Sequence, residues 1–340
     1  MRQAIMNSPG KIELRDVPPP VPGPDEILLR IQRIGVCGSD IHVWHGKHPF
    51  TPYPVVQGHE YSATVESVGR GVTKVKPGAK ATARPQLVCG ECDPCKRGDY
   101  NICDRLRVQG FQAPGCAQEF FVTTEERIVP LPDDLTYEQG ALVEPAACAA
   151  HSTARAGDLR GKNVVVLGAG TIGNLVAQAA GCRGAKKVLI TDLSDFRLKK
   201  ALACGVDAVC NVGTEKLADV AHRVFGAEGF DVAFEAVGAE AALDDAIQNI
   251  RKGGRIVVLG VFGERPRVDM SVAGDRELEL IGTLMYKHED YEQAVKWIAS
   301  GAVRTGPLIT RHFPFDRYAD AYRFIEEQGD KSLKVIIDVS

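Results

Sequence analysis

The stretch that decides the fold is Val164-Val165-Val166-Leu167-Gly168-Ala169-Gly170-Thr171-Ile172-Gly173. Its four leading apolar residues indicate a strand buried on both faces, and the segment after the glycines suits a helix. In that context GxGxxG indicates a dinucleotide-binding loop. Gly168 would permit the tight turn, Gly170 would let the backbone approach a pyrophosphate, and Gly173 would let the helix pack on the strand. A strand-to-helix turn without a ligand is the alternative interpretation.

An acidic residue at the end of the next predicted strand supports the dinucleotide interpretation. Asp192 would accept hydrogen bonds from a ribose 2′-hydroxyl and repel a 2′-phosphate, which predicts NAD rather than NADP. Arg197 could neutralise a 2′-phosphate, but one cation beside a well-placed carboxylate does not usually reverse the preference. The expected cofactor-binding residues are Gly168, Gly170, Thr171, Ile172, Gly173, Asp192, Arg197, Leu259, Gly260, Val261, Leu284 and Met285.

The rhythm of apolar residues changes between the two halves of the chain. Short alternating runs and Pro or Gly pairs before residue 150 favour an irregular, mostly antiparallel β lobe. After Lys162, continuous apolar runs separated by helix-length segments predict an α/β unit with a doubly wound parallel six-stranded sheet. Its strands are expected at Val164–Leu167, Val188–Ile190, Ala208–Cys210, Val232–Phe234, Ile256–Leu259 and Leu278–Ile281.

The remainder of the chain is expected to return to the first lobe. A helix beginning near Glu289 places Tyr291, Ala294, Val295 and Ile298 on one face, and a last strand is expected at Lys334–Val339. We therefore expect a catalytic domain made of residues 1–150 and 285–340, and an NAD-binding Rossmann domain at 151–284.

Composition narrows the class of protein. The chain has 340 residues and a mass of 36.7 kDa, which suggests two domains. A formal net charge of −3 gives no indication of nucleic acid or an anionic membrane as the main partner. The longest uncharged stretch, 163–182, is interrupted by polar residues and glycines, so no membrane span is expected. The first residues lack a secretion signal, so we expect a cytoplasmic protein with reduced thiols.

Four cysteines lie close together in a loop rich in glycine and proline. Cys89, Cys92, Cys95 and Cys103 suit a closed tetrahedral site for structural zinc. A [4Fe–4S] cluster is the competing occupant. Zinc is favoured because the rest of the chain offers no electron-transfer partner.

A second set of candidate metal ligands is dispersed along the chain. It comprises Cys37, the pair His59-Glu60, and Glu144. Taken singly, each has an ordinary structural explanation, as a small thiol, a hydrogen-bonded histidine and a carboxylate that starts a helix. Together they offer the donors of an open catalytic zinc site.

The cysteine tetrad, Gly58-His59-Glu60, Cys37-Gly38-Ser39-Asp40 and the glycine loop together resemble the zinc-containing medium-chain dehydrogenases of the alcohol dehydrogenase superfamily. Glu144-Pro145 is similar to the branch of sorbitol, L-threonine and sugar-acid dehydrogenases. The resemblance implies a GroES-like catalytic domain with Cys37, His59 and Glu60 as zinc ligands, and with Glu144 as a ligand or as a partner of the bound water. It also implies a proton relay through Ser39 and His42, two zinc ions per chain, and a homodimer or homotetramer.

The implied reaction is oxidation of a secondary alcohol of a polyol or sugar-derived substrate to a ketone by NAD+. Zinc would lower the pKa of the substrate hydroxyl, and the alkoxide would pass a hydride to the nicotinamide. Met285 stands where sorbitol dehydrogenases carry an arginine, so sorbitol itself is disfavoured. The stretch 46–50 is similar to sugar-acid dehydrogenases of the idonate and galactonate type. L-threonine-type and short-chain diol substrates stay open, as does a non-catalytic NAD-binding sensor.

Overall fold

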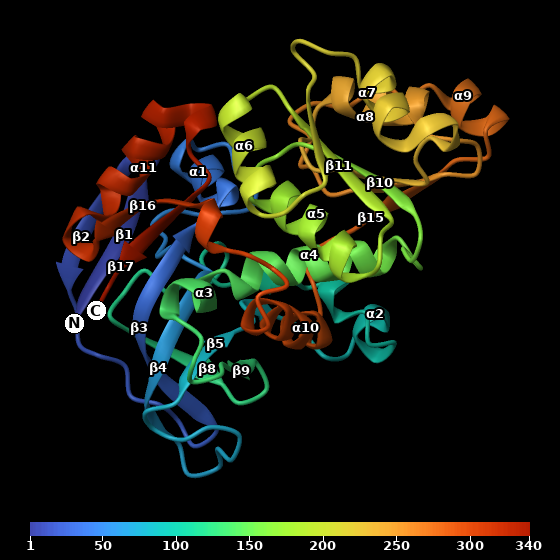
Figure 1. Cartoon of the computed structure of the whole chain (residues 1–340). Helices are drawn as coiled ribbons and strands as arrows, with labels where there is room; N and C mark the ends of the chain where they lie inside the picture. The colour runs from blue at the N-terminus through green and yellow to red at the C-terminus, as the bar shows by residue number, and fades with distance from the viewer. The chain divides into compact units, whose positions relative to one another are not determined.

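The apolar run at the glycine loop forms β10 (Asn163–Leu167), which lies inside a six-stranded, wholly parallel sheet. The computed structural model describes residues 1–340 (Figure 1). The sheet order is β12-β11-β10-β13-β14-β15. The other strands are β11 (Lys187–Asp192), β12 (Ala208–Asn211), β13 (Val232–Glu235), β14 (Arg255–Val258) and β15 (Glu279–Gly282). All six strands expected from the sequence are therefore present.

The strand order reverses direction between β10 and β13, so the loops after these two strands diverge at a topological switch point. Right-handed crossovers then place the helix after β10 and the helix after β13 on opposite faces of the sheet. The helices of this unit are α5 (Thr171–Cys182), α6 (Asp195–Ala203), α7 (Leu217–Phe225), α8 (Glu240–Asn249) and α9 (Met270–Asp275).

A second, mostly antiparallel sheet of seven strands contains residues from both ends of the chain. Its order is β16-β17-β3-β4-β5-β9. Strand β8 lies off this path and pairs with the first half of β3, residues 26–30. The strands are β3 (Glu26–Val36), β4 (Glu60–Val68), β5 (Lys80–Ala83), β8 (Phe120–Thr124), β9 (Ile128–Pro130), β16 (Ile309–Pro314) and β17 (Lys334–Asp338). Strand β17 pairs antiparallel with β3, so the last strand of the chain completes a sheet whose first strand begins at Glu26.

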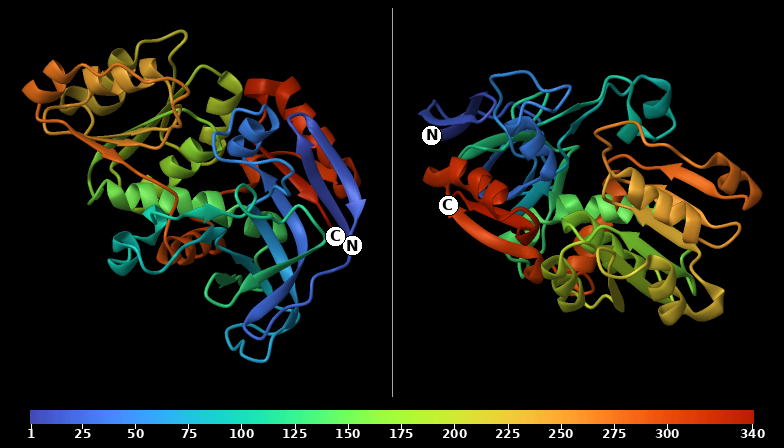
Figure 2. Two further views of the ribbon diagram at one scale, coloured as in Figure 1. Left: turned by 180° about the vertical axis from the view of Figure 1, so that it is seen from behind. Right: turned by 90° about the horizontal axis from the view of Figure 1, so that it is seen from above.

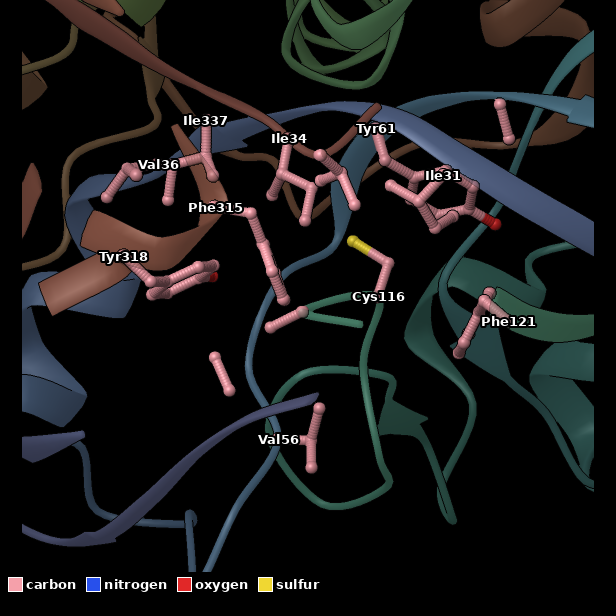
Figure 3. Packing of buried hydrophobic residues seen from close by; sticks show 14 of the residues in the cluster. Ile31, Ile34, Val36, Val56, Tyr61, Cys116, Phe121, Phe315, Tyr318 and Ile337 are labelled. Atoms are coloured by element: carbon pink, nitrogen blue, oxygen red, sulfur yellow. The ribbon is translucent and has the colours of Figure 1, made fainter. Parts of the chain in front are cut away.

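The core of this sheet gathers apolar side chains that are distant in sequence (Figure 3). Ile31 and Ile34 of β3 are fully buried, and Tyr61 of β4 packs edge-on against Phe121 of β8 at 5.6 Å between ring centroids. Ile337 of β17 belongs to the same cluster. Alternating burial along β3 and β8 explains the alternating apolar pattern of the first half of the sequence.

Smaller elements surround these two sheets. Two-stranded sheets are formed by β1 (Arg2–Ser8) with β2 (Lys11–Asp16) and by β6 (Gln86–Leu87) with β7 (Arg107–Val108). The other helices are α1 (Gly38–Trp44), α2 (Asp93–Lys96), α3 (Tyr137–Ala141), α4 (Val143–Arg155), α10 (His288–Ala299) and α11 (Tyr318–Gln328). None of the helices combines the length and the apolar character needed to cross a bilayer.

The chain divides into two compact units, and their limits differ from those expected. Unit 1 comprises residues 1–144, 287–299 and 309–340, whereas unit 2 comprises 145–286 and 300–308. The expected limits at 150 and 285 miss the short return at 300–308. That return belongs with unit 2 because the Arg304 amide donates to Oε1 of Gln178 at 2.6 Å. Both termini lie in unit 1, near one another in each view of Figure 2.

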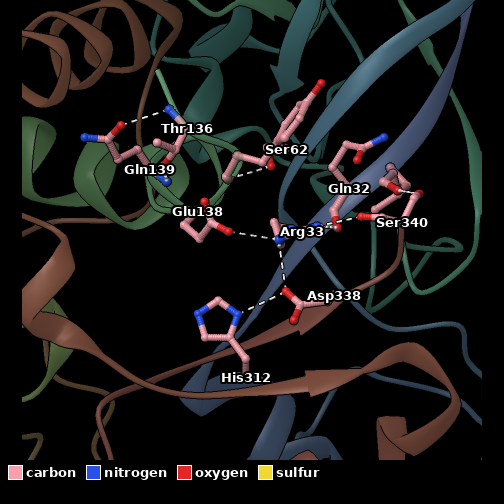
Figure 4. Close-up of polar contacts among 11 residues, drawn as sticks. Gln32, Arg33, Ser62, Thr136, Glu138, Gln139, His312, Asp338 and Ser340 are labelled. Atoms are coloured by element: carbon pink, nitrogen blue, oxygen red, sulfur yellow. Dashed lines mark hydrogen bonds and ion pairs between the residues drawn. The ribbon is translucent and has the colours of Figure 1, made fainter. Parts of the chain in front are cut away.

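Polar contacts fasten the C-terminal strand to the rest of unit 1 (Figure 4). Arg33 of β3 pairs with Glu138 of α3 at 3.1 Å and with Asp338 of β17 at 2.9 Å. The same guanidinium donates to the carbonyl of Ser340 at 2.7 Å, and His312 of β16 contacts Asp338 at 3.0 Å. One arginine therefore links a central strand, a helix and the end of the chain.

Candidate functional site

Cys37 lies at the junction between β3 and α1. The residue is extended (φ −91°, ψ 155°) and caps the helix, and its amide donates to Oδ2 of Asp40 at 2.9 Å. An N-cap residue has left the strand but has not entered the helix, so its side chain projects from the junction. The segment Cys37-Gly38-Ser39-Asp40 thus presents one thiol at a fixed position.

His59 and Glu60 reach the same place from the start of β4. Glu60 pairs with Gly35 in the antiparallel register of β3 and β4, two residues before Cys37. A Cβ at Gly35 would lie 2.3 Å from Oε2 of Glu60, so only glycine leaves room for this carboxylate. One ligand atom each from Cys37, His59 and Glu60 lies within 4.8 Å of the others. The structure therefore brings together three of the four dispersed candidates.

The environment of His59 is buried and acidic. Its Nδ1 lies 3.5 Å from Oδ1 of Asp40, and the two side chains are 6% and 1% exposed. Burial alone would lower the pKa of His59, but the charge of Asp40 and contacts with Asp40 and Cys37 raise it well above 6.5. A carboxylate behind a histidine fixes the orientation of the ring, as in metal sites where histidine is a ligand.

Glu60 also has a partner from the C-terminal strand. Lys334 of β17 donates its ammonium to Oε2 of Glu60 and to the carbonyl of Val36, the latter at 3.1 Å. Burial opposes the charge on Lys334, yet the Glu60 carboxylate and Cys37 raise its pKa above the ordinary value. The amine therefore stays charged and compensates the negative donors around it.

Glu144, the fourth candidate, is buried at the start of α4 but is not a member of the group within 4.8 Å. Its charge does act on Lys334, since it contributes to the raised pKa of that amine.

Ser39 and His42 lie on α1, three positions apart, and the His42 side chain is exposed. Residues at this spacing share a helix face, so the two predicted relay residues lie on the same side of α1.

The four clustered cysteines also converge. Their sulfur atoms lie within 4.8 Å of one another, with Cys89 and Cys103 at 3.5 Å and Cys92 and Cys103 at 3.8 Å. The backbone amide of Cys92 donates to Cys89 and lowers the pKa of that thiol to about 6. Four converging sulfurs, one favoured as thiolate, fit a tetrahedral divalent cation. None of the ten cysteines of the chain forms a disulfide.

The glycine loop has the geometry expected of a phosphate-binding turn. Gly168 has φ +98°, and a Cβ there would lie 2.8 Å from Val237 in the loop after β13. A Cβ at Gly173 would lie 1.8 Å from the carbonyl oxygen of Gly168. Any residue larger than glycine at this position would therefore push the helix away from the strand. Gly170 caps α5, and a Cβ there would meet nothing within 4 Å. Backbone amides at this helix start are thus open to an anion, which fits a pyrophosphate.

Asp192 ends β11 and binds the glycine loop. Its Oδ2 accepts from the amide of Ala169 at 2.8 Å, and its Oδ1 accepts from Ser194 at 2.9 Å. Arg197 lies 3.9 Å from Oδ2 of the same carboxylate. The predicted ribose-binding residue therefore also holds the loop in place.

The other predicted cofactor residues follow two neighbouring strands. Leu259, Gly260 and Val261 follow β14, and Leu284 and Met285 follow β15, where Met285 has φ +50°. Buried Glu235, at the end of β13, accepts from the amides of Val237 and Gly238, both at 2.8 Å. A Cβ at Gly260 would lie 2.4 Å from its Oε2, so Glu235 lies against both loops.

Sequence reasoning missed Asp40, Lys334 and Glu235. Asp40 belongs to the quoted Cys37-Gly38-Ser39-Asp40 segment, and its position three residues after an N-cap is a signal for capping. Lys334 begins an apolar strand, and Glu235 ends one. A charged residue in a buried run indicates a buried partner, but it does not identify that partner.

Comparison with known proteins agrees with this arrangement. Residues 23–133 match the family described as "Alcohol dehydrogenase GroES-like domain", and residues 171–300 match "Zinc-binding dehydrogenase". An L-threonine 3-dehydrogenase of Rhizobium etli (strain CIAT 652) is 34% identical over 99% of both chains. The sorbitol dehydrogenase of Homo sapiens is 35% identical and covers 94% of this chain and 90% of that protein.

A solved structure has the same fold throughout. It is named a short chain alcohol dehydrogenase, comes from Escherichia coli CFT073 and is complexed with NADH. Its TM-score is 0.92 at 27% identity, covering 100% of this chain and 99% of that one. The antiparallel sheet carrying Cys37, His59 and Glu60 is thus the GroES-like part, and the six-stranded sheet is the Rossmann part. The chain belongs to the zinc-binding dehydrogenases of the alcohol dehydrogenase family.

Proposed function

We propose that this protein oxidises a secondary alcohol of a polyol or sugar-derived substrate to a ketone with NAD+. The observation that carries the proposal is the convergence of Cys37, His59 and Glu60 within 4.8 Å, beside the buried cation Lys334. A thiolate, an imidazole and a carboxylate suit a zinc site that keeps one position open. Zinc, when bound, supplies a Lewis acid that makes the substrate hydroxyl more acidic.

The chain's own residues orient the donors and move the proton. Asp40, 3.5 Å behind Nδ1 of His59, is proposed to orient the ring, and Lys334 is proposed to balance the charge of Glu60. Ser39 and His42 share a face of α1, and exposed His42 can pass a proton to solvent. Glu144, buried close enough to act on Lys334, is proposed as an alternative zinc ligand or as a partner of bound water.

The same proposal includes NAD and two zinc ions per chain. The open helix start at Gly170 suits the pyrophosphate, and Asp192 suits the ribose hydroxyls and disfavours a 2′-phosphate. The tetrad Cys89, Cys92, Cys95 and Cys103 suits a structural zinc. The residues of each site thus have the chemistry needed for the ligand proposed there, NAD or zinc.

The test combines a substrate screen with one variant. NAD+ reduction by the zinc-loaded protein is measured with polyols, aldonates, inositols and short diols. Cys37→Ser should abolish turnover, while binding of NADH, followed by its fluorescence, persists. Loss of both together would show that Cys37 is needed for folding. Silence of the wild-type protein with every alcohol, despite bound NAD and zinc, would favour a non-catalytic sensor.

A sugar acid is the second candidate for the substrate. Lys47 is exposed, and the adjacent His48 stacks on Phe111, whose ring centroid lies 5.0 Å from that of His59. These ring contacts support the proposal that Lys47, next to His48, faces the carboxylate of a substrate bound at the zinc ligands. If the substrate is an aldonate, Lys47→Gln should raise its KM and leave the KM of a neutral polyol unchanged.

We further propose a homodimer or homotetramer, acting in the cytoplasm on a small alcohol. Strand β15 is the last strand of its sheet and exposes Leu280, and an uncovered edge of this kind favours pairing with another strand. Light scattering coupled to gel filtration measures the oligomeric state. A monomer at micromolar concentration would contradict this part of the proposal.

A further inference from the structure

A chain of buried polar contacts runs from the zinc ligand His59 to the C-terminal helix α11. Nδ1 of His59 lies 3.5 Å from Oδ1 of Asp40, and Nε2 of Gln57 donates to the same oxygen at 3.3 Å. The hydroxyl of Tyr322 in turn donates to Oε1 of Gln57 at 3.2 Å. Gln57 and Tyr322 are separated by 265 positions in sequence.

The four residues are shielded from water. Exposure is 5% for His59, 1% for Asp40, 2% for Gln57 and 0% for Tyr322. Polar groups buried to this degree are costly unless they are paired. Breaking the contacts among these residues is therefore expected to cost free energy, because water cannot replace the lost partners.

Donor and acceptor chemistry fixes the direction of each hydrogen bond in this series. An ionised aspartate can only accept, so the amide of Gln57 must turn its NH2 group toward Asp40. Its carbonyl then faces Tyr322, and the tyrosine hydroxyl must donate. Asp40 is held on its other oxygen by the amide of Cys37 at 2.9 Å. Asp40, Gln57 and Tyr322 therefore each have one orientation that satisfies the hydrogen bonds between them, whereas Nδ1 of His59 faces Asp40 at ion-pair distance without a hydrogen bond.

Aromatic packing locks the far end of the chain. The ring of Tyr322 lies 5.4 Å from that of Trp44, at the end of the same helix α1 that carries Asp40, and 5.7 Å from that of Tyr318. The tyrosine cannot turn away from Gln57 without breaking these contacts. Helix α11 thereby acts as a rigid support for the metal site.

We infer that Gln57 and Tyr322 are positioning residues for the catalytic zinc, acting through Asp40 on the ring of His59. The inference rests on the proposed zinc site, but not on the identity of the substrate. Partners behind a ligating histidine typically change metal affinity by about 10- to 100-fold when they are removed. The zinc held by Cys37, His59 and Glu60 is therefore retained more tightly because α11 is in place.

The experiment measures zinc release from the purified holoenzyme to an excess of the dye 4-(2-pyridylazo)resorcinol. The phase that belongs to the catalytic site is the one lost in Cys37→Ala, and the phase of the cysteine tetrad serves as an internal standard. Tyr322→Phe and Gln57→Met should each accelerate zinc release from the catalytic site by about 10-fold or more. This is the usual size of the effect when a residue behind a metal ligand is removed. The tetrad phase should not change.

A double variant separates positioning from simple stability. Tyr322→Phe together with Gln57→Met removes both members of the hydrogen bond between these two residues, a change that can be nearly neutral for folding, while Asp40 loses the Gln57 donor but keeps the Cys37 amide. We expect thermal stability to recover in the double variant while zinc release stays fast. Recovery of slow release along with stability would overturn the inference, because the contacts would then serve folding alone.

The matched control is Tyr61→Phe. It removes the same hydroxyl from a fully buried tyrosine of the same unit, but this hydroxyl has no hydrogen-bond partner. Zinc release from Tyr61→Phe should equal that of the wild type. Equal acceleration in Tyr61→Phe and Tyr322→Phe would also overturn the inference. Neither result depends on dehydrogenase activity, so failure here is distinct from failure of the proposed reaction.

Discussion

Lys334 and Glu60 form an ion pair in the interior of unit 1, where their side chains are 3% and 1% exposed. The lysine comes from β17 and the glutamate from β4, 274 positions apart in the sequence. A buried pair is weak evidence for net stability, but removing one partner leaves an uncompensated charge. The pair therefore makes the carboxylate of Glu60 dependent on a cation.

Lys334→Met should destabilise the zinc-free protein by about 3 to 5 kcal/mol, the usual cost of breaking a buried pair. Zinc supplies a positive charge at the same carboxylate, so the loss should be smaller in the zinc-loaded protein. Urea denaturation of both forms measures the difference. The exposed Lys331→Met, in the same C-terminal segment, should have little effect. An equal loss with and without zinc would show that Lys334 does not compensate Glu60.

Asp192→Asn tests the cofactor preference without releasing the glycine loop. The amide oxygen can still accept from Ala169, whereas the charge that repels a 2′-phosphate is gone. We expect the ratio of kcat/KM for NADP+ over NAD+ to rise about 10-fold or more, since 1.4 kcal/mol of removed repulsion is tenfold. Asp195→Asn, an exposed change nearby in α6, serves as the control. No gain in the ratio would contradict the assignment of Asp192 to the ribose.

Cys95→Ser should remove one zinc and leave the other. With three thiols the tetrad loses its closed tetrahedral set, and structural zinc contributes on the order of 10 kcal/mol to the order of such a loop. The zinc content measured by elemental analysis should fall from two ions per chain to one. Hydrogen exchange of the backbone amides should increase in the segment 89–103. Unchanged exchange in that segment after complete zinc loss would show that the loop is ordered without metal.

Glu235→Gln should flatten the dependence of stability on pH. Burial raises the pKa of Glu235 above 4.5, against the opposing effect of the backbone amides of Gly238 and Val237. The folded state thus keeps a proton that the unfolded chain releases, so unfolding free energy falls as pH rises from 4.5 through the higher folded pKa. Glutamine removes this fall. Denaturation across the window measures both slopes, and equal slopes would contradict the raised pKa.

The nucleotide-binding half was predictable because its signals are local. Strands buried on both faces are continuous apolar runs, and glycine is required at position 173 by a contact with the carbonyl oxygen of nearby Gly168. The convergence of Cys37 with His59 and Glu60 was not predictable from spacing alone. It depends on the register of β3 against β4, which local patterns do not specify.

The residues that support the proposed metal site could not be predicted from local sequence patterns. Nothing near Gln57 indicates Tyr322, and nothing near Glu60 indicates Lys334, since each pair forms only when the C-terminal segment packs on unit 1. The limits of the two units were missed at 300–308 for the same reason. Contacts of the Arg304 backbone with Gln178 and Cys204, both distant in sequence, join this return to unit 2.

Strand β17 has a consequence for the order of events during synthesis. Residues 1–144 leave the ribosome long before residue 334, and until then β3 lacks its neighbour and Glu60 lacks its cation. Residues 145–286 are contiguous, so the parallel sheet can fold while translation continues. We therefore expect the proposed metal centre to be completed last. A chain that stops short of β17 would carry a complete nucleotide fold without a competent zinc site.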